Sequence, residues 1–195
     1  MKKIVVLISG SGSNLEAIIE SCAAKMINGR VIQVISNNPD AYGLTRASKF
    51  NIASKIIDHK KFSSRIDFEN SLEEFLDKLS PDLVVLAGFM RILGPKITSK
   101  FFNKMINLHP SLLPKYPGLN THEKVLENKD PRHGISIHYV SSELDAGPLI
   151  AQGLIDINKD ETLENMIKRI HKIEHLLLPE IINEICNGNI YLDNN

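Results

Sequence analysis

One run of apolar residues near the N-terminus places the strongest constraint on the fold. Residues 3–9 read Lys-Ile-Val-Val-Leu-Ile-Ser, and no polar residue interrupts the five apolar ones. A half-buried strand alternates apolar and polar residues, whereas a strand covered on both faces is continuously apolar. The run therefore predicts a strand in the middle of a sheet, with helices packed on both sides.

Strand and helix segments alternate along the rest of the chain, as their apolar spacing indicates. We expect strands at residues 3–9, 31–36, 52–57, 82–87, 105–108, 134–140 and 149–157, and helices at 15–26, 42–50, 66–79 and about 161–186. The core face of the helix at 66–79 is predicted to comprise Ile66, Leu72, Phe75, Leu76 and Leu79. This order predicts an α/β fold with a doubly wound, mostly parallel, Rossmann-like sheet and helices on both faces.

Length and charge limit the class of protein. A chain of 195 residues suits one α/β domain, so we expect a single domain over residues 1–195. The 23 basic residues balance the 23 acidic ones, which gives no electrostatic case for nucleic acid or an anionic membrane. Cys22 and Cys186 lie far apart, without metal-ligand spacing, which favours a reducing compartment. No apolar run approaches the ~20 residues of a membrane helix, so we expect a cytoplasmic protein.

A glycine-rich loop, Ser-Gly-Ser-Gly-Ser-Asn at residues 9–14, follows the first predicted strand and opens the first predicted helix. Free N–H groups at a helix N-terminus favour an anion, and glycine lets a phosphate approach the backbone. Leu15 occupies the place of the third glycine of a dinucleotide fingerprint, and the Lys-Ser/Thr ending of a P-loop is absent. The loop favours a monophosphate over NAD or ATP. The alternative is a structural turn capped by Ser13 or Asn14.

The segment Asn-Leu-His-Pro-Ser-Leu-Leu-Pro at residues 107–114 carries the strongest chemical signal. Asn107 and His109 are two residues apart, so their side chains point the same way in a strand, and Pro110 keeps His109 extended. An amide donor beside an imidazole suits a reaction that builds charge on oxygen and moves a proton. Asp145, before Ala-Gly-Pro, is by itself a turn former. It joins this pair if its loop folds back onto His109.

The stretch His171 to His175 fits the H-x-x-E-H pattern of one zinc protease class, with Glu174 as its acid. A catalytic zinc needs a third protein ligand, and the few residues that follow do not supply an evident one. We therefore expect no metal, and interpret the segment as a polar helix face near a substrate or as solvated surface.

Arg91 interrupts an apolar segment just after a predicted buried strand. It is either a snorkelling surface arginine or part of an apolar pocket wall for a flat ligand, together with Met90, Ile92 and Leu93. Arg65 is open to the simpler interpretation of a helix start. Three further histidines are interpreted as packing or surface residues: His122, His133 and His138. Of these, His138 lies on a predicted strand beside the expected site.

Taken together, these motifs resemble the phosphoribosylglycinamide formyltransferase family, folate-dependent enzymes of purine synthesis. The resemblance runs over essentially the whole chain. It includes the loop at residues 8–14, the segments at 35–37, 41–44 and 82–93, the motif at 107–118, and the segments at 133–140 and 143–148. It implies transfer of the formyl group of 10-formyltetrahydrofolate to the amine of 5′-phosphoribosylglycinamide, without a metal, through a tetrahedral intermediate. Folate would bind at the C-terminal edge of the sheet.

The resemblance also implies residue roles. Asn107, His109 and Asp145 match the family's catalytic trio. The ribonucleotide contacts would be Gly12, Ser13, Asn14 and Glu174. The folate contacts would be Arg65, Met90, Arg91, Ile92, Leu93, Asn107, Tyr139, Val140, Ser141 and Leu144. Residues 1–100 would form the phosphate-binding half, and residues 101–195 would supply the catalytic loop, folate loop and C-terminal helix. The implied partners are small-molecule substrates, without nucleic acid or membrane, in a monomer or homodimer.

Three other functions share part of this pattern. A 10-formyltetrahydrofolate hydrolase would pass the formyl group to water, but such enzymes usually carry an extra N-terminal domain. A methionyl-tRNA formyltransferase would need an extra C-terminal domain and a basic surface. A non-catalytic nucleotide-binding module would keep the glycine-rich loop but has no use for Asn107, His109 and Asp145 together.

Overall fold

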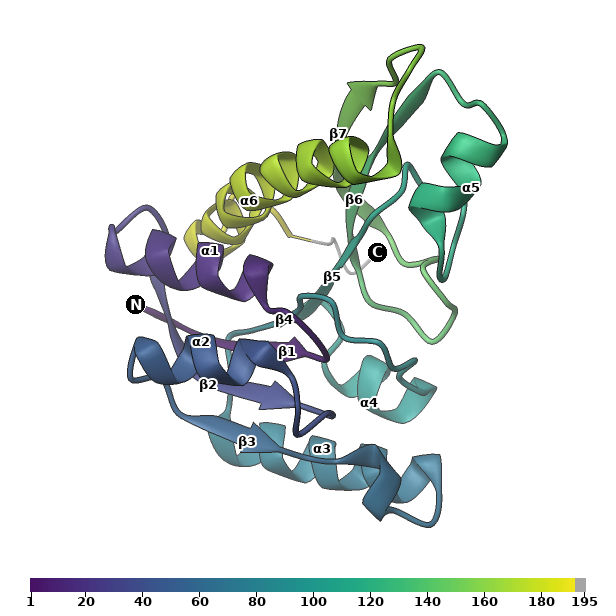
Figure 1. Ribbon diagram of the computed structural model, residues 1–195. Helices are drawn as coiled ribbons and strands as arrows, with labels where there is room; N and C mark the ends of the chain where they lie inside the picture. The colour runs from purple at the N-terminus through teal and green to yellow at the C-terminus, as the bar shows by residue number, and fades with distance from the viewer. Residues whose placement is uncertain (192–195) are drawn as a thin grey trace.

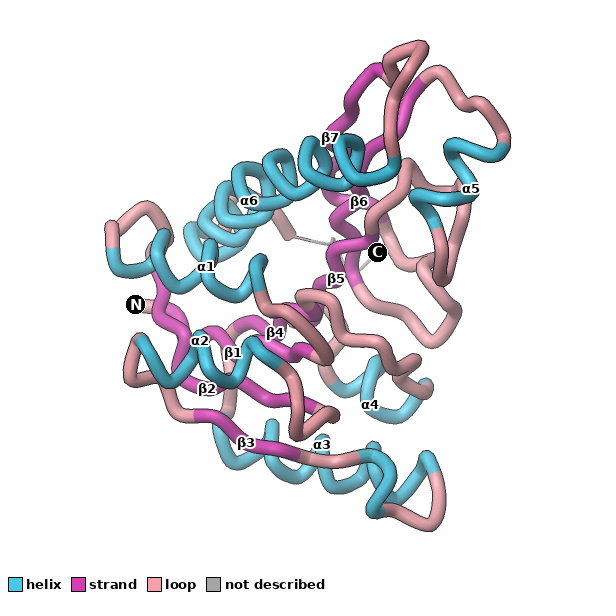
Figure 2. Tube along the Cα trace, in the orientation of Figure 1, coloured by secondary structure: helices cyan, strands magenta, loops and turns pink. Residues whose placement is uncertain are grey.

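The computed structural model describes residues 1–191, which are built around one seven-stranded sheet (Figures 1 and 2). The strand order is β3-β2-β1-β4-β5-β6-β7. The strands are β1 (Lys2–Ile8), β2 (Gly29–Ser36), β3 (Ser54–Ile56), β4 (Leu83–Leu86), β5 (Met105–His109), β6 (Arg132–Tyr139) and β7 (Leu149–Asp156). Strands β1 to β5 are parallel, β6 is antiparallel to β5, and β7 is antiparallel to β6. The predicted mostly parallel sheet is confirmed.

Helices cover both faces of this sheet. They are α1 (Ser13–Ala23), α2 (Tyr42–Lys49), α3 (Arg65–Leu79), α4 (Pro95–Lys100), α5 (Thr121–Glu127) and α6 (Leu163–Asn187), with a short 3-10 turn at His59–Lys61. Buried residues of α1, α2, α5 and α6 belong to one hydrophobic cluster, and those of α3 and α4 to another. Figure 1 shows α1 and α6 on one side of the sheet, opposite α3 and α4. The doubly wound arrangement is thereby confirmed.

Strand β1 shows why the apolar run was informative. Ile4, Val6 and Ile8 belong to the cluster under α1 and α6, whereas Val5 and Leu7 belong to the cluster over α3. All five side chains are fully buried. Each such burial contributes roughly 1.5–3 kcal/mol relative to exposure, so a polar residue on either face of β1 would be costly.

The predicted core face of α3 was wrong at one position. Ile66 is 68% exposed, whereas Phe68 is 3% exposed and occupies the core with Leu72 and Leu76. Phe68, Leu72 and Leu76 follow one another at four-residue spacing and form one stripe. Ile66 lies two residues before Phe68, about 200° around the helix, and therefore faces solvent.

The helices α4 and α5 were not predicted, because segments of six and seven residues are too short to show a periodic pattern. The predicted C-terminal helix is present as α6, with Thr162 capping its start by accepting from the Asn165 N–H, and Gly188 at φ +78° following its end. Among residues 1–191, none of the helices combines the length and the apolar character needed to cross a bilayer.

Candidate active site

The glycine-rich loop joins β1 to α1, with Gly12 as the residue before the helix. Gly12 has φ +71°, and a Cβ there would lie 2.5 Å from the Cα of Gly43, so both conformation and space demand glycine. Among residues 1–191, no side chain caps α1, so the cap considered for Ser13 or Asn14 is not found. The first-turn N–H groups are therefore available to an anion.

Asn14 and Glu174 connect the start of α1 to α6. Asn14 Nδ2 donates to Glu174 Oε2 over 2.9 Å, and Glu174 is 5% exposed. Burial raises the pKa of the Glu174 carboxyl above its ordinary value, against the opposing effect of the Asn14 hydrogen bond. Within the described residues, Asn14 Oδ1 is buried without a hydrogen-bond partner. The pair thus presents oxygen acceptors beside the N-terminus of α1.

The end of β5 brings together the three groups that we call the candidate catalytic trio: Asn107, His109 and Asp145. His109 Nδ1 lies 3.3 Å from Asp145 Oδ2. Asn107 Nδ2 donates to Asp145 Oδ1 over 3.3 Å. The loop between β6 and β7 therefore folds back onto β5, and Asp145 is more than a turn former.

A backbone carbonyl fixes the orientation of the His109 ring. His109 Nε2 lies 2.8 Å from Tyr116 O, and a carbonyl oxygen only accepts, so Nε2 carries a hydrogen. The other ring nitrogen, Nδ1, faces Asp145. His109 is 5% exposed, and the Asp145 carboxylate lies beside its Nδ1.

The charge of Asp145 is set by opposing effects. Burial raises the pKa of its carboxyl, but the nearby His138 ring, the hydrogen bond from the Gly118 N–H and positive charge at His109 together lower it by more. The net pKa lies below its ordinary value, so Asp145 is ionised at neutral pH. The Gly118 N–H donates to Asp145 Oδ2 over 2.8 Å, the same oxygen that faces His109.

His138 was interpreted from the sequence only as a packing or surface residue on a strand beside the expected site, but it contacts two members of the trio. Its Nε2 lies 3.2 Å from Asn107 Nδ2 and 3.7 Å from Asp145 Oδ1. Its Nδ1 lies 2.8 Å from Tyr139 O, and because a carbonyl oxygen only accepts, Nδ1 carries a hydrogen. Asn107 and His138 are direct partners in the antiparallel β5–β6 register. The signal that would have found His138 is this pairing across strands, not its position in the chain.

A cavity of about 860 Å³ adjoins the trio. Its lining includes residues 88–93, which follow the C-terminal end of β4, and Pro110, which follows the C-terminal end of β5. The predicted folate residues in its lining are Met90, Arg91, Ile92, Leu93, Asn107, Val140, Ser141 and Leu144. Met90, Ile92 and Leu144 are 69%, 49% and 47% exposed, so the wall presents apolar surface to a ligand. This supports the pocket-wall interpretation of the segment around Arg91.

Some predicted contacts lie outside the lining of this cavity. Arg65 is at the start of α3, where its Nε donates to Glu69 Oε1 over 2.6 Å. Tyr139 is 3% exposed and packs in the core. The loop at residues 12–14 and Glu174 are also outside the lining, and they form a separate group around α1.

The H-x-x-E-H segment lies on α6, where the rings of His171 and His175 stack with centroids 6.1 Å apart. Glu174 turns instead toward Asn14. Within the part of the chain that the structure describes, no three His, Cys, Asp or Glu side chains cluster as metal ligands would.

Comparison with known proteins matches the chain to the formyl transferase family over residues 2–182. The chain belongs to this family. It is 44% identical over 192 residues to the phosphoribosylglycinamide formyltransferase of Escherichia coli K12, covering 98% of this chain and 91% of that protein. It is 40% identical over 195 residues to the Haemophilus influenzae enzyme of the same name, covering 100% and 92%.

Solved structures agree with this placement. The phosphoribosylglycinamide formyltransferase of Coxiella burnetii has a TM-score of 0.95 and 48% identity, with coverage of 100% of this chain and 91% of that one. Glycinamide ribonucleotide transformylase 1 of Symbiobacterium toebii also has a TM-score of 0.95, with 39% identity and coverage of 100% and 92%. Within the formyl transferases, the chain is therefore one of the phosphoribosylglycinamide formyltransferases, as the resemblance implied.

Proposed function

We propose that this chain transfers the formyl group of 10-formyltetrahydrofolate to the amine of 5′-phosphoribosylglycinamide, in purine biosynthesis. The observation that carries the proposal is the convergence of the candidate catalytic trio at the edge of the 860 Å³ cavity. An amide N–H donor, an imidazole and an ionised carboxylate within hydrogen-bond reach suit acyl transfer with a charged intermediate. Family membership supports the reaction class, and the names of the relatives support the acceptor.

The proposal assigns a separate set of binding residues to each of the two substrates. The ribonucleotide phosphate binds the N–H groups at Gly12, Ser13 and Asn14, and its glycinamide part contacts Glu174. The folate lies along the wall at residues 90–93, with Asn107, Val140, Ser141 and Leu144 across the cavity. Arg65 and Tyr139 complete the proposed folate contacts. Residues 1–100 and 101–195 form the two functional halves of one domain.

The reaction begins when the amine lone pair attacks the formyl carbon, and the carbonyl electron pair moves onto oxygen. Asn107 Nδ2–H and His109 Nδ1–H donate to this oxyanion, while Asp145 stabilises the imidazolium. One proton moves from the attacking nitrogen to the folate nitrogen, with Asp145 orienting the relay through water. The oxyanion then re-forms the carbonyl as the carbon–folate nitrogen bond breaks, releasing tetrahydrofolate and the formylated ribonucleotide.

These groups perform the chemistry without a metal, and 10-formyltetrahydrofolate is the cosubstrate. The proposal includes a cytoplasmic protein that acts as a monomer or homodimer on small molecules.

The test is a transfer assay with the purified chain, 10-formyltetrahydrofolate and 5′-phosphoribosylglycinamide. Appearance of tetrahydrofolate and formylated ribonucleotide in equal amounts supports the proposal. Formate release without the ribonucleotide would support the hydrolase, and binding of the ribonucleotide without turnover would support a nucleotide-binding module. Asn107→Ala should abolish most transfer. Asp156→Asn, at an exposed ion pair with Arg132, should leave it unchanged.

A further inference from the structure

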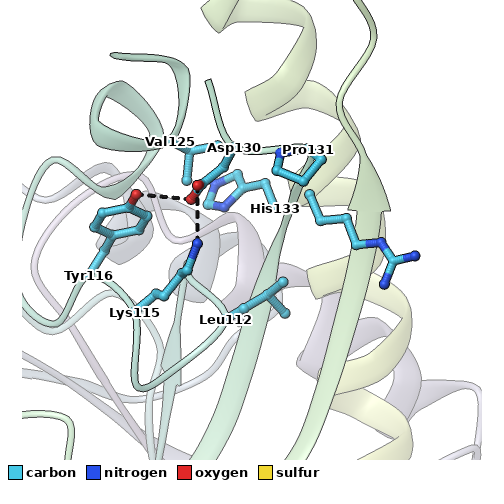
Figure 3. Close-up of a pocket in the computed structure, with 8 residues that line it drawn as sticks. Leu112, Lys115, Tyr116, Val125, Asp130, Pro131 and His133 are labelled. Carbon is cyan, nitrogen blue, oxygen red and sulfur yellow. Dashed lines mark hydrogen bonds and ion pairs between the residues drawn. The ribbon is translucent and has the colours of Figure 1, made fainter. Parts of the chain in front are cut away.

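A second cavity of about 380 Å³ lies between the loop that follows β5, α5 and the start of β6. Figure 3 shows Asp130 at its centre, with the side chains of Tyr116 and Lys115 reaching its carboxylate. Tyr116 Oη donates to Asp130 Oδ2 over 2.9 Å, and Lys115 Nζ donates to Asp130 Oδ1 over 3.0 Å. The mechanism above gives none of these side chains a role.

The chain segment at residues 111–118, which we call the support loop, carries both donors and also touches the trio. Tyr116 O accepts from His109 Nε2 over 2.8 Å. The Gly118 N–H donates to Asp145 Oδ2 over 2.8 Å. The support loop therefore fixes the imidazole at one end of the His109–Asp145 contact and the carboxylate at the other.

Each half of the support loop has its own anchor. The first half is attached to the sheet through Ser136, whose Oγ accepts from the Leu113 N–H and donates to Ser111 O. The second half, which bears the contacts to the trio, is attached through Asp130. The Asp130 N–H donates to Val125 O at the end of α5, so Asp130 is itself fixed to the scaffold.

The second half of the support loop contains a backbone conformation that local preference does not favour. Tyr116 has φ +54°, a left-handed conformation that few non-glycine residues adopt, and such a conformation persists when surrounding contacts determine it. The Tyr116–Asp130 hydrogen bond is one such contact. Loss of it would free Tyr116 O to move away from His109 Nε2.

We propose that Asp130 is a positioning residue for formyl transfer: through Tyr116 and Lys115 it holds the support loop, which orients His109 against Asp145. This inference rests on the proposed function and adds a residue to it. Asp130 lies outside the lining of the 860 Å³ cavity, so its effect is expected in the chemical step and not in substrate binding. A misplacement of about 1 Å can cost on the order of 100-fold in rate, and partial loosening of a loop costs less, about tenfold.

The experiment compares kcat, both KM values and melting temperature for Asp130→Ala and Asp130→Asn, with Asp156→Asn as the matched control. Asp156 also forms an ion pair, with Arg132, but contacts no part of the support loop in the described structure. We expect kcat to fall about tenfold in Asp130→Ala with both KM values within about twofold. Asp130→Asn keeps an acceptor for Tyr116 Oη and should retain most of kcat.

Two readouts separate positioning from general destabilisation. In a His109→Asn background, Asp130→Ala should add no further loss of the residual rate, because it acts through His109. The ring ¹⁵N signals of His109 should change in Asp130→Ala and stay unchanged in Asp156→Asn.

An equal fold-loss in the two backgrounds, or a normal kcat in folded Asp130→Ala, would overturn the proposal. Unchanged His109 ring signals would also overturn it. If the unmodified protein shows no formyl transfer, the proposed function fails, and the ¹⁵N comparison still decides whether Asp130 positions His109.

Discussion

Replacing Asp145 with asparagine tests the trio most directly, because the shape is kept and the charge is removed. Asp145 accepts from the Gly118 N–H at 2.8 Å and from Asn107 Nδ2 at 3.3 Å, and it faces His109 Nδ1 at 3.3 Å. In Asp145→Asn, the remaining oxygen can keep the Gly118 contact. The new NH₂ then faces Asn107 Nδ2, donor against donor, and the negative charge beside His109 is lost.

The size of the effect follows from these contacts. A hydrogen bond to a charged group contributes about 1.5–3 kcal/mol, and the carboxylate side chain is 8% exposed, so solvent screens it little. If that amount is lost in the transition state, the rate falls about 10- to 150-fold, since each 1.36 kcal/mol corresponds to a factor of ten. The KM for the ribonucleotide should change less than about twofold, because the loop at Gly12 lies outside the cavity that Asp145 lines.

The assay measures kcat and both KM values for the unmodified protein, for Asp145→Asn and for the control Asp156→Asn. Melting temperatures establish that each variant is folded. A kcat within threefold of the unmodified value in folded Asp145→Asn would refute the reasoning, and Asp145 would then be only a turn residue. A large rise in the ribonucleotide KM with normal kcat would show that Asp145 acts in binding.

Three further predictions concern other parts of the molecule. Gly12→Ala should lose about 1–3 kcal/mol of stability and bind the ribonucleotide more weakly, because Gly12 has φ +71° and an added Cβ would collide with Gly43. Gly10→Ala is the control in the melting and binding titrations, because a Cβ at Gly10 meets no atom within 4 Å. Burial, and then charge on His122, lower the pKa of His133 to about 4. The unfolded chain therefore binds more protons between about pH 6.5 and 4, and stability falls by up to about 3 kcal/mol as pH drops through this range; urea denaturation of His133→Gln should show a shallower fall. Activity should survive exhaustive dialysis against EDTA, and a loss restored by zinc would contradict the metal-free mechanism.

The parts of the fold that sequence predicted are those governed by local patterns. Strand β1 was predictable because burial on both faces leaves a continuous apolar run. Asn107 and His109 were expected on the same side of a strand, and both lie on β5. The one wrong position on α3, Ile66, lies in the first helical turn about 200° around the helix from Phe68, so the four-residue spacing of Phe68, Leu72 and Leu76 would have excluded it from the core face.

The parts that sequence reasoning missed depend on contacts between distant segments. His138 joins the trio because β6 pairs with β5 in an antiparallel register, and nothing around His138 in the chain specifies that register. Tyr116 O contacts His109 through a backbone atom, which carries no side-chain signature. The resemblance supplied Asp145, whose local sequence indicates only a turn.

The backbone angle of Asp145 restricts which amino acids could replace it during evolution. Asp145 has φ +50°, in the left-handed region. Glycine, asparagine and aspartate enter this region at low cost, whereas most other residues do not. Glycine and asparagine have no carboxylate, and glutamate has one but is longer and less suited to this angle. Aspartate alone meets both requirements, so selection on the shape of the turn and on its charge converges on one residue. Asn107, on an extended strand, is under no such conformational restriction.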